Sequence, residues 1–303
     1  MKKLLGLVLS LALICFASPV CALNQPLGIN LGATNFLDGA SPGPGWYLTE
    51  YIQMISADEI NDDDGHTVPG LNDVNLDALI SLTQVIYQSD KMFLGGNPGL
   101  DLIFPVGDID VDFPLSSQDG FGDVYIGPFI QWGPHMLFGK PYFHRFEFQV
   151  IAPTGANDED NALNIGSDVW SLNPYYVFTY FLTPKLTTSL RFHYLWTSEN
   201  DNRDPMPDIQ AGQAIHFNYA AAYAVTDSLR LGVAGYYLKQ LEEDEFDGHS
   251  IDDTEEEVFA IGPGLVWHIN PALTFMGAIN WETEAENRPE GYRSTLRFIW
   301  KFW

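Results

Sequence analysis

Cysteine is nearly absent from this sequence of 303 residues, which contains only Cys15 and Cys21. Both lie within residues 1–22, where Lys2 and Lys3 precede an apolar stretch and small residues lead up to Ala22. This order is typical of a secretory signal peptide, and we expect cleavage after about Ala22. The mature chain then has no cysteine, which excludes a small secreted scaffold held together by disulfides.

Basic residues are scarce as well. Without Lys2 and Lys3, 12 of the 14 lysines and arginines remain against 40 acidic residues, a formal net charge of −28. Because nucleic-acid binding depends on lysines and arginines that neutralise phosphates, this balance argues strongly against nucleic acid as a partner. High charge also occurs in disordered chains, but 46% hydrophobic and 14% aromatic residues are too many for disorder.

Long apolar runs are the third absence. No run of about 18 apolar residues follows the signal, so no transmembrane helix is expected. The sequence instead alternates apolar and polar residues, the period of a strand with two different faces. In segment 186–196, for example, Phe192 and Tyr194 share one face, whereas Arg191 and His193 share the other. Twelve segments are predicted to be strands, at residues 45–56, 74–88, 92–106, 120–132, 143–153, 170–182, 186–198, 213–225, 229–240, 256–268, 272–283 and 292–303.

The links between these segments alternate in length. Those on one side are tight at 89–91, 183–185, 226–228 and 269–271, and longer at 133–142. Those on the other side are longer and acidic, as at Asp62-Asp63-Asp64 and Glu242-Glu243-Asp244-Glu245. Short links on one side and long links on the other, an even strand count, and tryptophans near strand ends are typical of outer-membrane barrels. We predict an all-β fold over residues 45–303, a transmembrane antiparallel up-and-down β-barrel of about 12 strands with short periplasmic turns and long acidic extracellular loops.

Residues 23–44 precede the first predicted strand. They are rich in glycine, proline and asparagine and have neither strand nor helix periodicity. The segment either enters the barrel lumen as a plug or lies in the periplasm, and the sequence leaves both alternatives open.

Short motifs with glycine, proline or tryptophan are spread in order from about Pro69 to the end: Gly122-Asp123 with Pro128 and Trp132, Pro153-Thr154-Gly155, Gly166 with Trp170 and Pro174, Gly232-Val233-Ala234-Gly235-Tyr236-Tyr237 with Gln240, Gly262-Pro263, and Asn287-Arg288-Pro289 with Gly291. Together they resemble the outer-membrane family named for the meta-cleavage pathway of phenol degradation. The resemblance implies a barrel that is associated with aromatic-compound degradation and admits hydrophobic molecules, and it supplies no catalytic residues. Residues 200–212 depart from the family pattern, because Met206-Pro207 and Ala211-Gly212 stand where the family has an asparagine-rich stretch before Ser-Gly.

Charged and polar side chains fall on the predicted inward face of several strands. The basic members form either a strip that guides anions or pairs with Glu147 and Glu282 that fill the barrel, and the narrow interior of a barrel of this size favours pairing. Metal-ligand spacing is absent, so His193 and His216 are interpreted as polar fillers. The candidate lumen-lining residues are Arg145, Glu147, Arg191, His193, His216, Glu282, Arg293, Arg297 and Lys301.

Two loop features complete the set of candidate sites. Arg288, in the link before the last strand, either gates the pore or pins the turn against acidic neighbours, with Pro289 stiffening it. The acidic loops offer oxygens that suit divalent cations, but no spacing matches the EF-hand loop. Solvated loops, bridged by ions to lipopolysaccharide, are therefore favoured, and neither a metal site nor a cofactor is predicted.

An enzymatic role is not expected, because no histidine begins the His-x-Ser pattern of outer-membrane phospholipases. We predict an outer-membrane channel or uptake barrel for small hydrophobic or aromatic molecules. Its expected partners are outer-membrane lipid, lipopolysaccharide and the barrel-assembly machinery. The alternative from another class is a non-transporting structural or surface-binding protein of the outer membrane. A general diffusion porin fits less well, because such porins usually have more strands.

Overall fold

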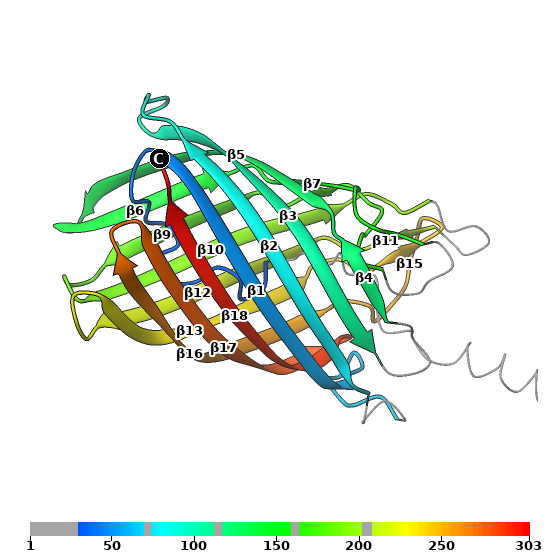
Figure 1. The fold of residues 1–303 in the computed structure, drawn as a ribbon. Helices are drawn as coiled ribbons and strands as arrows, with labels where there is room; N and C mark the ends of the chain where they lie inside the picture. The colour runs from blue at the N-terminus through cyan, green and yellow to red at the C-terminus, as the bar shows by residue number, and fades with distance from the viewer. Residues whose placement is uncertain (1–29, 70–73, 112–116, 159–163, 202–207) are drawn as a thin grey trace, which may run out of the picture.

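The computed structural model describes residues 30–69, 74–111, 117–158, 164–201 and 208–303. The predicted signal peptide lies outside these residues. Within the described ranges, no helix is long and apolar enough to cross a membrane. The chain is built from tilted strands that wrap around a common axis (Figure 1).

The main sheet is a closed antiparallel barrel with twelve strand positions, as predicted. Three neighbouring positions hold strands that are interrupted, at residues 122–123, 148–149 and 173–174. Around the barrel the positions are β1 (Gly45–Ile60), β2 (Leu76–Gln88), β3 (Asn97–Val111), β4 with β5 (Gln118–Phe121, Val124–Leu137), β6 with β7 (Lys140–Glu147, Val150–Ala152), β8 with β9 (Ser171–Leu172, Tyr175–Phe181), β10 (Leu186–Thr197), β12 (Ala214–Ala224), β13 (Leu229–Gln240), β16 (Glu257–Asn270), β17 (Leu273–Glu286) and β18 (Pro289–Lys301).

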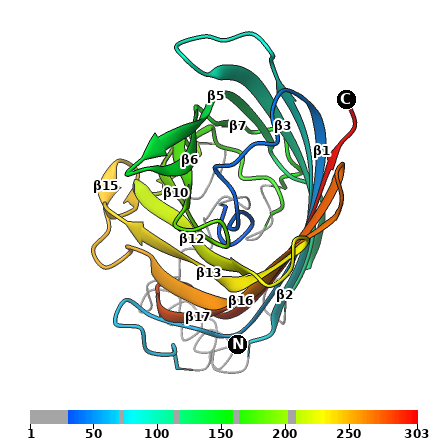
Figure 2. The same cartoon turned by 90° about the vertical axis from the view of Figure 1, so that its left-hand side faces the viewer.

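The ring closes where the first strand meets the last. β1 pairs with β18 from Tyr47 opposite Lys301 to Ile60 opposite Pro289, and the view along the axis shows the resulting ring (Figure 2). Each of the twelve strand positions therefore has a neighbour on both sides. Closure meets the requirement of a lipid environment, which offers no hydrogen-bond partner to an open strand edge.

Five links gather at one end of the barrel, the turn end, where β1 begins and β18 finishes (Figure 1): 89–96, 138–139, 182–185, 225–228 and 271–272. Two of them differ from the prediction. The link between β2 and β3 is longer, because β3 begins at Asn97. The link between β5 and β6 is a two-residue turn, because both strands continue past residue 133. Phe138 and Gly139 have φ angles of 49° and 73°, which suit a tight hairpin of type I′.

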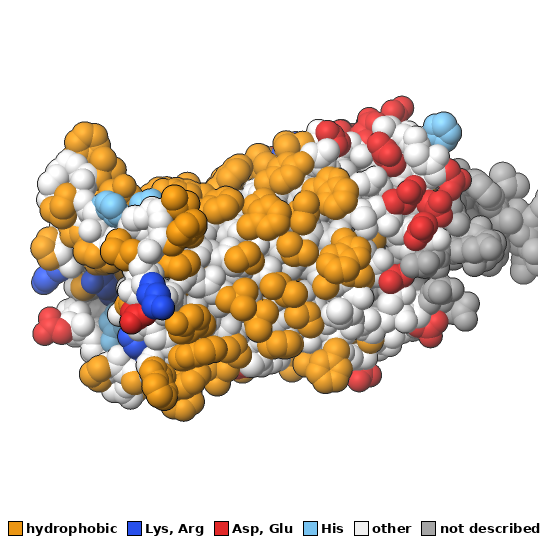
Figure 3. Space-filling model, turned by 90° about the horizontal axis from the view of Figure 1, so that it is seen from above, with side chains coloured by type: hydrophobic (Ala, Val, Ile, Leu, Met, Phe, Trp, Pro, Cys, Tyr) orange, Lys and Arg blue, Asp and Glu red, His pale blue; other side chains and the backbone are white. Residues whose placement is uncertain are grey.

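The opposite end, the loop end, carries the longer links, and acidic side chains gather there (Figure 3). Parts of two loops form a small separate sheet from β11 (Ile209–Gln210), β14 (Glu245–Phe246) and β15 (His249–Ser250). The link before the last strand departs from the prediction. It consists of Asn287 and Arg288 alone, because β17 runs to Glu286 and β18 starts at Pro289.

The two faces of the barrel wall follow the predicted alternation. On β10, Arg191 and His193 are buried inside, whereas Phe192 is 43% exposed on the outside. Large apolar side chains form a broad band on the outer face in the middle of the barrel (Figure 3). Trp267 and Trp281 are about half exposed on this outer face. The outer surface therefore suits lipid, and the inner surface holds most of the buried polar groups.

Candidate solute site in the barrel lumen

Residues 30–44, the lumen segment, run through the inside of the barrel to the start of β1 (Figure 2). Leu31 and Phe36 in this segment are each only 1% exposed. Of the two alternatives left open by the sequence, the described part of the segment occupies the lumen and does not lie outside the barrel.

The ring of Phe36 explains why the facing strands carry small residues. It packs in a cluster that includes Ala220, Ala234 and Ala278 from three strands. A Cβ atom added to Gly264 would lie 2.6 Å from the Phe36 ring, closer than real contacts allow. The small side chains of β12, β13, β16 and β17 therefore leave the space that the lumen segment fills.

Asp38 fixes the segment by charge. Its carboxylate lies 2.5 Å from Nε of Arg191 on β10 and 3.2 Å from Nη1 of Arg297 on β18. Side-chain amides add hydrogen bonds to the backbone of the segment, since Gln53 donates to the carbonyl of Leu31 and Gln131 to that of Gly39. Two arginines and two glutamines from four different strands thus hold a segment that has no regular secondary structure of its own.

Arg145 and Glu147 form a second buried group on β6. Nη1 of Arg145 lies 3.8 Å from the Glu147 carboxylate, and the Arg145 guanidinium also covers the Phe129 ring at 4.0 Å. The hydroxyl of Tyr175 donates to Glu147 at 2.6 Å. These contacts match the interpretation in which inward charges pair and fill the barrel.

A third group lies at the loop end around Arg288. Its guanidinium bridges Glu256 at 3.2 Å and Glu282 at 3.8 Å. Burial raises the pKa of the Glu256 carboxyl, in the loop before β16, to about 8, although nearby Arg288 opposes this rise. Asn287 donates to the carbonyls of Asp253 and Glu255. The two turn residues thus tie the β17–β18 turn to the 241–256 loop, which favours the pinning role of Arg288 over gating.

His193 and His216 lie fully buried on the inner wall and stack with ring centres 4.2 Å apart. Both rings contact the side-chain oxygen of Asn173, at 2.9 and 3.2 Å. Lys301 is separate from the other candidates, at the turn end, with its Nζ 5.4 Å from the centre of the Tyr47 ring. In the described part of the chain, no three His, Cys, Asp or Glu side chains are placed to hold a metal ion together.

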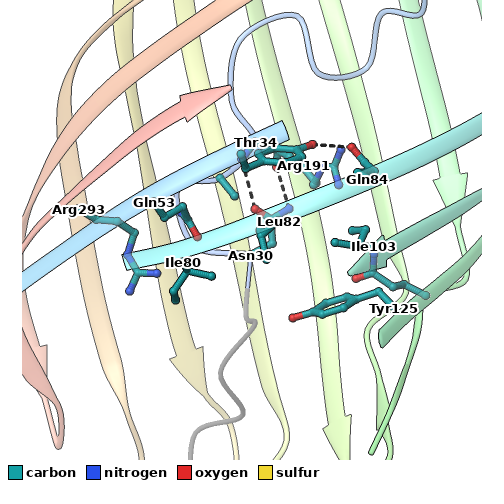
Figure 4. Close-up of a pocket in the computed structure, with 13 residues that line it drawn as sticks. Asn30, Thr34, Gln53, Ile80, Leu82, Gln84, Ile103, Tyr125, Arg191 and Arg293 are labelled. Carbon is teal, nitrogen blue, oxygen red and sulfur yellow. Dashed lines mark hydrogen bonds between the residues drawn. The ribbon is translucent and has the colours of Figure 1, made fainter. Parts of the chain in front are cut away.

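A cavity lies between the lumen segment and the opposite wall (Figure 4). Ile80, Leu82 and Ile103 of β2 and β3 form an apolar side, whereas Arg191 and Arg293 are its two charged groups. A smaller, apolar cavity shares Ile80 and Leu82. The other residues around the first cavity are Asn30, Ala33, Thr34, Tyr51, Gln53, Gln84, Tyr125 and Gln149.

Sequence reasoning missed the apolar side of this cavity. It assigned polar residues to the lumen and apolar residues to lipid, so Ile80, Leu82 and Ile103 were not among the candidates. The signal that would have found two of them is the stretch Leu79-Ile80-Ser81-Leu82, where apolar residues occupy both faces of one strand. Alternation cannot show which apolar face turns inward until the barrel closes.

The protein family described as "Putative MetA-pathway of phenol degradation" matches residues 57–298. The chain belongs to this family. No curated protein matches significantly. An outer membrane channel of Pseudomonas putida F1 has the same fold, with a TM-score of 0.78 and 18% identity over 87% of this chain and 97% of that chain. The transport unit of the autotransporter AIDA-I of Escherichia coli gives a TM-score of 0.52 and 11% identity over 95% and 97%.

The structure explains why several motifs of the phenol-degradation family occur together. Asp123 lies in the break between β4 and β5, where its carboxylate accepts hydrogen bonds from the backbone of Thr154, Gly155 and Ser167 at 2.7–2.9 Å. A Cβ atom on Gly155 would lie 2.6 Å from Cα of Gly166. One carboxylate and two closely packed glycines thus fix residues 154–155 and 166–167 to the barrel wall. Residues 202–207, within the segment that departs from the family pattern, lie outside the described ranges.

Proposed function

We propose that the protein is an outer-membrane channel that takes up small hydrophobic or aromatic molecules. The observation that carries the proposal is the cavity inside the closed barrel, with Ile80, Leu82 and Ile103 on one side. Protein sites for small molecules typically have mostly apolar walls with a few polar groups. The adjoining apolar cavity, which shares Ile80 and Leu82, extends this environment to Pro105 and Gly122 at the first strand break.

The comparisons support the same proposal. The name of the family refers to phenol degradation, and the structure from Pseudomonas putida F1 is called an outer membrane channel. In this proposal the turn end faces the periplasm, and the acidic loop end faces lipopolysaccharide. The signal peptide and the barrel-assembly machinery bring the chain to the membrane, and the lumen residues, Arg145, Arg191 and Arg297 among them, line the route without a catalytic role.

Substitution of Leu82 by tryptophan tests whether the cavity is the route. The larger ring fills the cavity, so the initial rate of uptake of a radiolabelled aromatic hydrocarbon by expressing cells falls several-fold. Leu79→Trp is the matched control, because Leu79 lies on the same strand but is 51% exposed on the outer face. Equal uptake with Leu82→Trp and with the unchanged protein would show that solutes do not use this cavity.

A second candidate, a non-transporting structural or surface-binding barrel, is favoured by one observation. The lumen segment fills part of the interior and is held by the two ion pairs of Asp38. Single-channel conductance of the refolded protein in a planar bilayer separates the candidates. Stable ionic steps that aromatic solutes block support the channel, whereas a silent barrel that does not speed uptake in cells supports the structural role.

A further inference from the structure

Arg293 differs from the other polar groups around the cavity. Its side chain is 11% exposed, yet the described residues give it no hydrogen bond, and its Nε atom is buried without a partner. Its contact with Glu282 is 3.9 Å long, beyond hydrogen-bond range. A guanidinium carries five N–H donors, and leaving buried donors unused costs free energy. Arg293 therefore offers donors to whatever occupies the cavity.

The remaining polar groups of the cavity are already engaged within the protein. Tyr51 donates to Gln84 at 2.8 Å, and Asn30 donates to Thr34 at 2.8 Å. Arg191 is paired with Asp38. A solute that needs several polar contacts therefore finds few, and one with a single polar group finds Arg293 beside Ile80 (Figure 4).

The strand next to Arg293 shows the same shortage of partners. Asn280 lies opposite Arg293 in the pairing of β17 with β18, and both atoms of its buried amide lack a hydrogen-bond partner. Asn280 is not on the cavity wall. Of these two residues, Arg293 is therefore the one that a solute in the cavity contacts. Around it, buried hydrogen-bonding groups outnumber their partners.

Charge decides which kind of polar group fits. The carboxylate of Glu282 lies 3.8 Å from Arg288 and 3.9 Å from Arg293, so an anion bound by Arg293 would lie near this carboxylate. An anionic solute would receive the donors of Arg293 but would be repelled by Glu282, because like charges in a poorly solvated interior interact strongly. A neutral oxygen accepts the hydrogen bond without this repulsion.

We infer that Arg293 selects, among small hydrophobic solutes, those that carry one neutral oxygen such as a hydroxyl group. The inference rests on the proposed function and adds a specificity-determining residue to it. The ring of such a solute lies against Ile80, Leu82 and Ile103, and its oxygen accepts a hydrogen bond from the Arg293 guanidinium. An unsubstituted hydrocarbon offers that guanidinium no hydrogen-bond acceptor, so it binds less tightly.

Equilibrium binding to the refolded full-length barrel in detergent tests the inference with three probes of similar size: phenol, toluene and benzoate. Empty micelles measure partition into detergent. A hydrogen bond to a charged group is commonly worth a tenfold or larger change in affinity. We therefore expect phenol to bind about tenfold more tightly than toluene, with benzoate weakest.

The variants Arg293→Met and Arg293→Lys assign the effect to this side chain. In Arg293→Met the preference for phenol over toluene falls to within about twofold, while toluene binding persists. Arg293→Lys keeps a charged donor and therefore keeps part of the preference for phenol. Arg230→Met, which changes an arginine at the turn end far from the cavity residues, keeps the full preference. Folding of each variant is checked by its heat-dependent mobility on gels.

The outcomes separate this inference from the proposed function. Equal binding of phenol and toluene, a preference that survives in Arg293→Met, or tightest binding of benzoate overturns the inference and leaves the channel proposal standing. Binding of none of the three probes overturns both. If Arg293→Met does not fold, the loss of part of the preference in Arg293→Lys decides the question.

Discussion

Arginines buried in the barrel interior lie within 4 Å of buried carboxylates. Glu147 and Glu282 were predicted as inward partners, and they lie 3.8 Å from Arg145 and 3.9 Å from Arg293. Asp38 was not predicted, because it lies in a segment without periodicity, where no pattern shows which way a side chain points. Side chains on strands can be assigned to a face from alternation alone, whereas side chains on irregular segments cannot.

Glu256 provides a pH prediction at the scale of a single residue. Its folded-state pKa of about 8 lies above the ordinary value of 4.5. The stability that the protonated carboxyl contributes to the folded protein is therefore fully present below about pH 4.5 and is lost as the pH rises towards 8. We expect Glu256→Gln to remove this part of the pH dependence of the unfolding free energy, which is at most about 5 kcal/mol. Urea unfolding of both proteins at pH 5, 7 and 9, followed by tryptophan fluorescence, measures the difference.

Other acidic groups in the loops titrate in the same range, so the comparison of the two proteins carries the test rather than the profile of either one. Burial also raises the pKa of Asp244, for example. If the unchanged protein and Glu256→Gln lose stability in parallel from pH 5 to pH 9, Glu256 ionises in the folded loop as easily as it does in water.

At the scale of elements, the lumen segment depends on the barrel wall for its position. It has no strand partners, and its contacts come from Phe36 in a pocket of small residues and from Asp38 between Arg191 and Arg297. An irregular segment stays ordered only if such contacts outweigh the conformational entropy lost on ordering it. The anchoring of this segment therefore sets how open the lumen is.

Asp38→Asn tests this anchoring. Removing one partner of a buried ion pair typically costs about 3–5 kcal/mol, and here two arginines lose their counter-charge. We expect the segment to leave its site, which raises single-channel conductance several-fold and exposes the segment to limited proteolysis. Asp227→Asn, in the exposed turn between β12 and β13, is the control and leaves both readouts unchanged. Unaltered conductance in Asp38→Asn would show that the segment stays in place without the two ion pairs.

At the scale of the whole molecule, closure is the decisive feature. The barrel has no free edge because β18 pairs with β17 on one side and with β1 on the other. The long apolar outer face and the inner polar groups follow from this closure, since each residue then faces either lipid or the lumen. The three interrupted strands lie side by side, and Asp123 bonds the loop over the first break.

Deletion of residues 289–303 tests the dependence on closure. The unpaired edges of β1 and β17 would each cost several kcal/mol per backbone group exposed to lipid or detergent. We expect no folded form with heat-dependent gel mobility after refolding into detergent. Deletion of residues 302–303 removes two backbone hydrogen bonds to Trp46 but keeps the β1–β18 pairing from Tyr47 to Ile60, and it serves as the control. A folded 289–303 deletion would mean that the barrel closes by another pairing.

The sequence by itself determined the strand positions, the alternation of faces and the division into a turn end and a loop end. These are local properties, because alternation and link length are written in consecutive residues. Tertiary structure alone decided that residues 30–44 enter the lumen, that Asp38 meets Arg191 and Arg297, and that Ile80 and Leu82 face a cavity. These depend on residues far apart in the chain, which come together only when the sheet closes and encloses a space of fixed width.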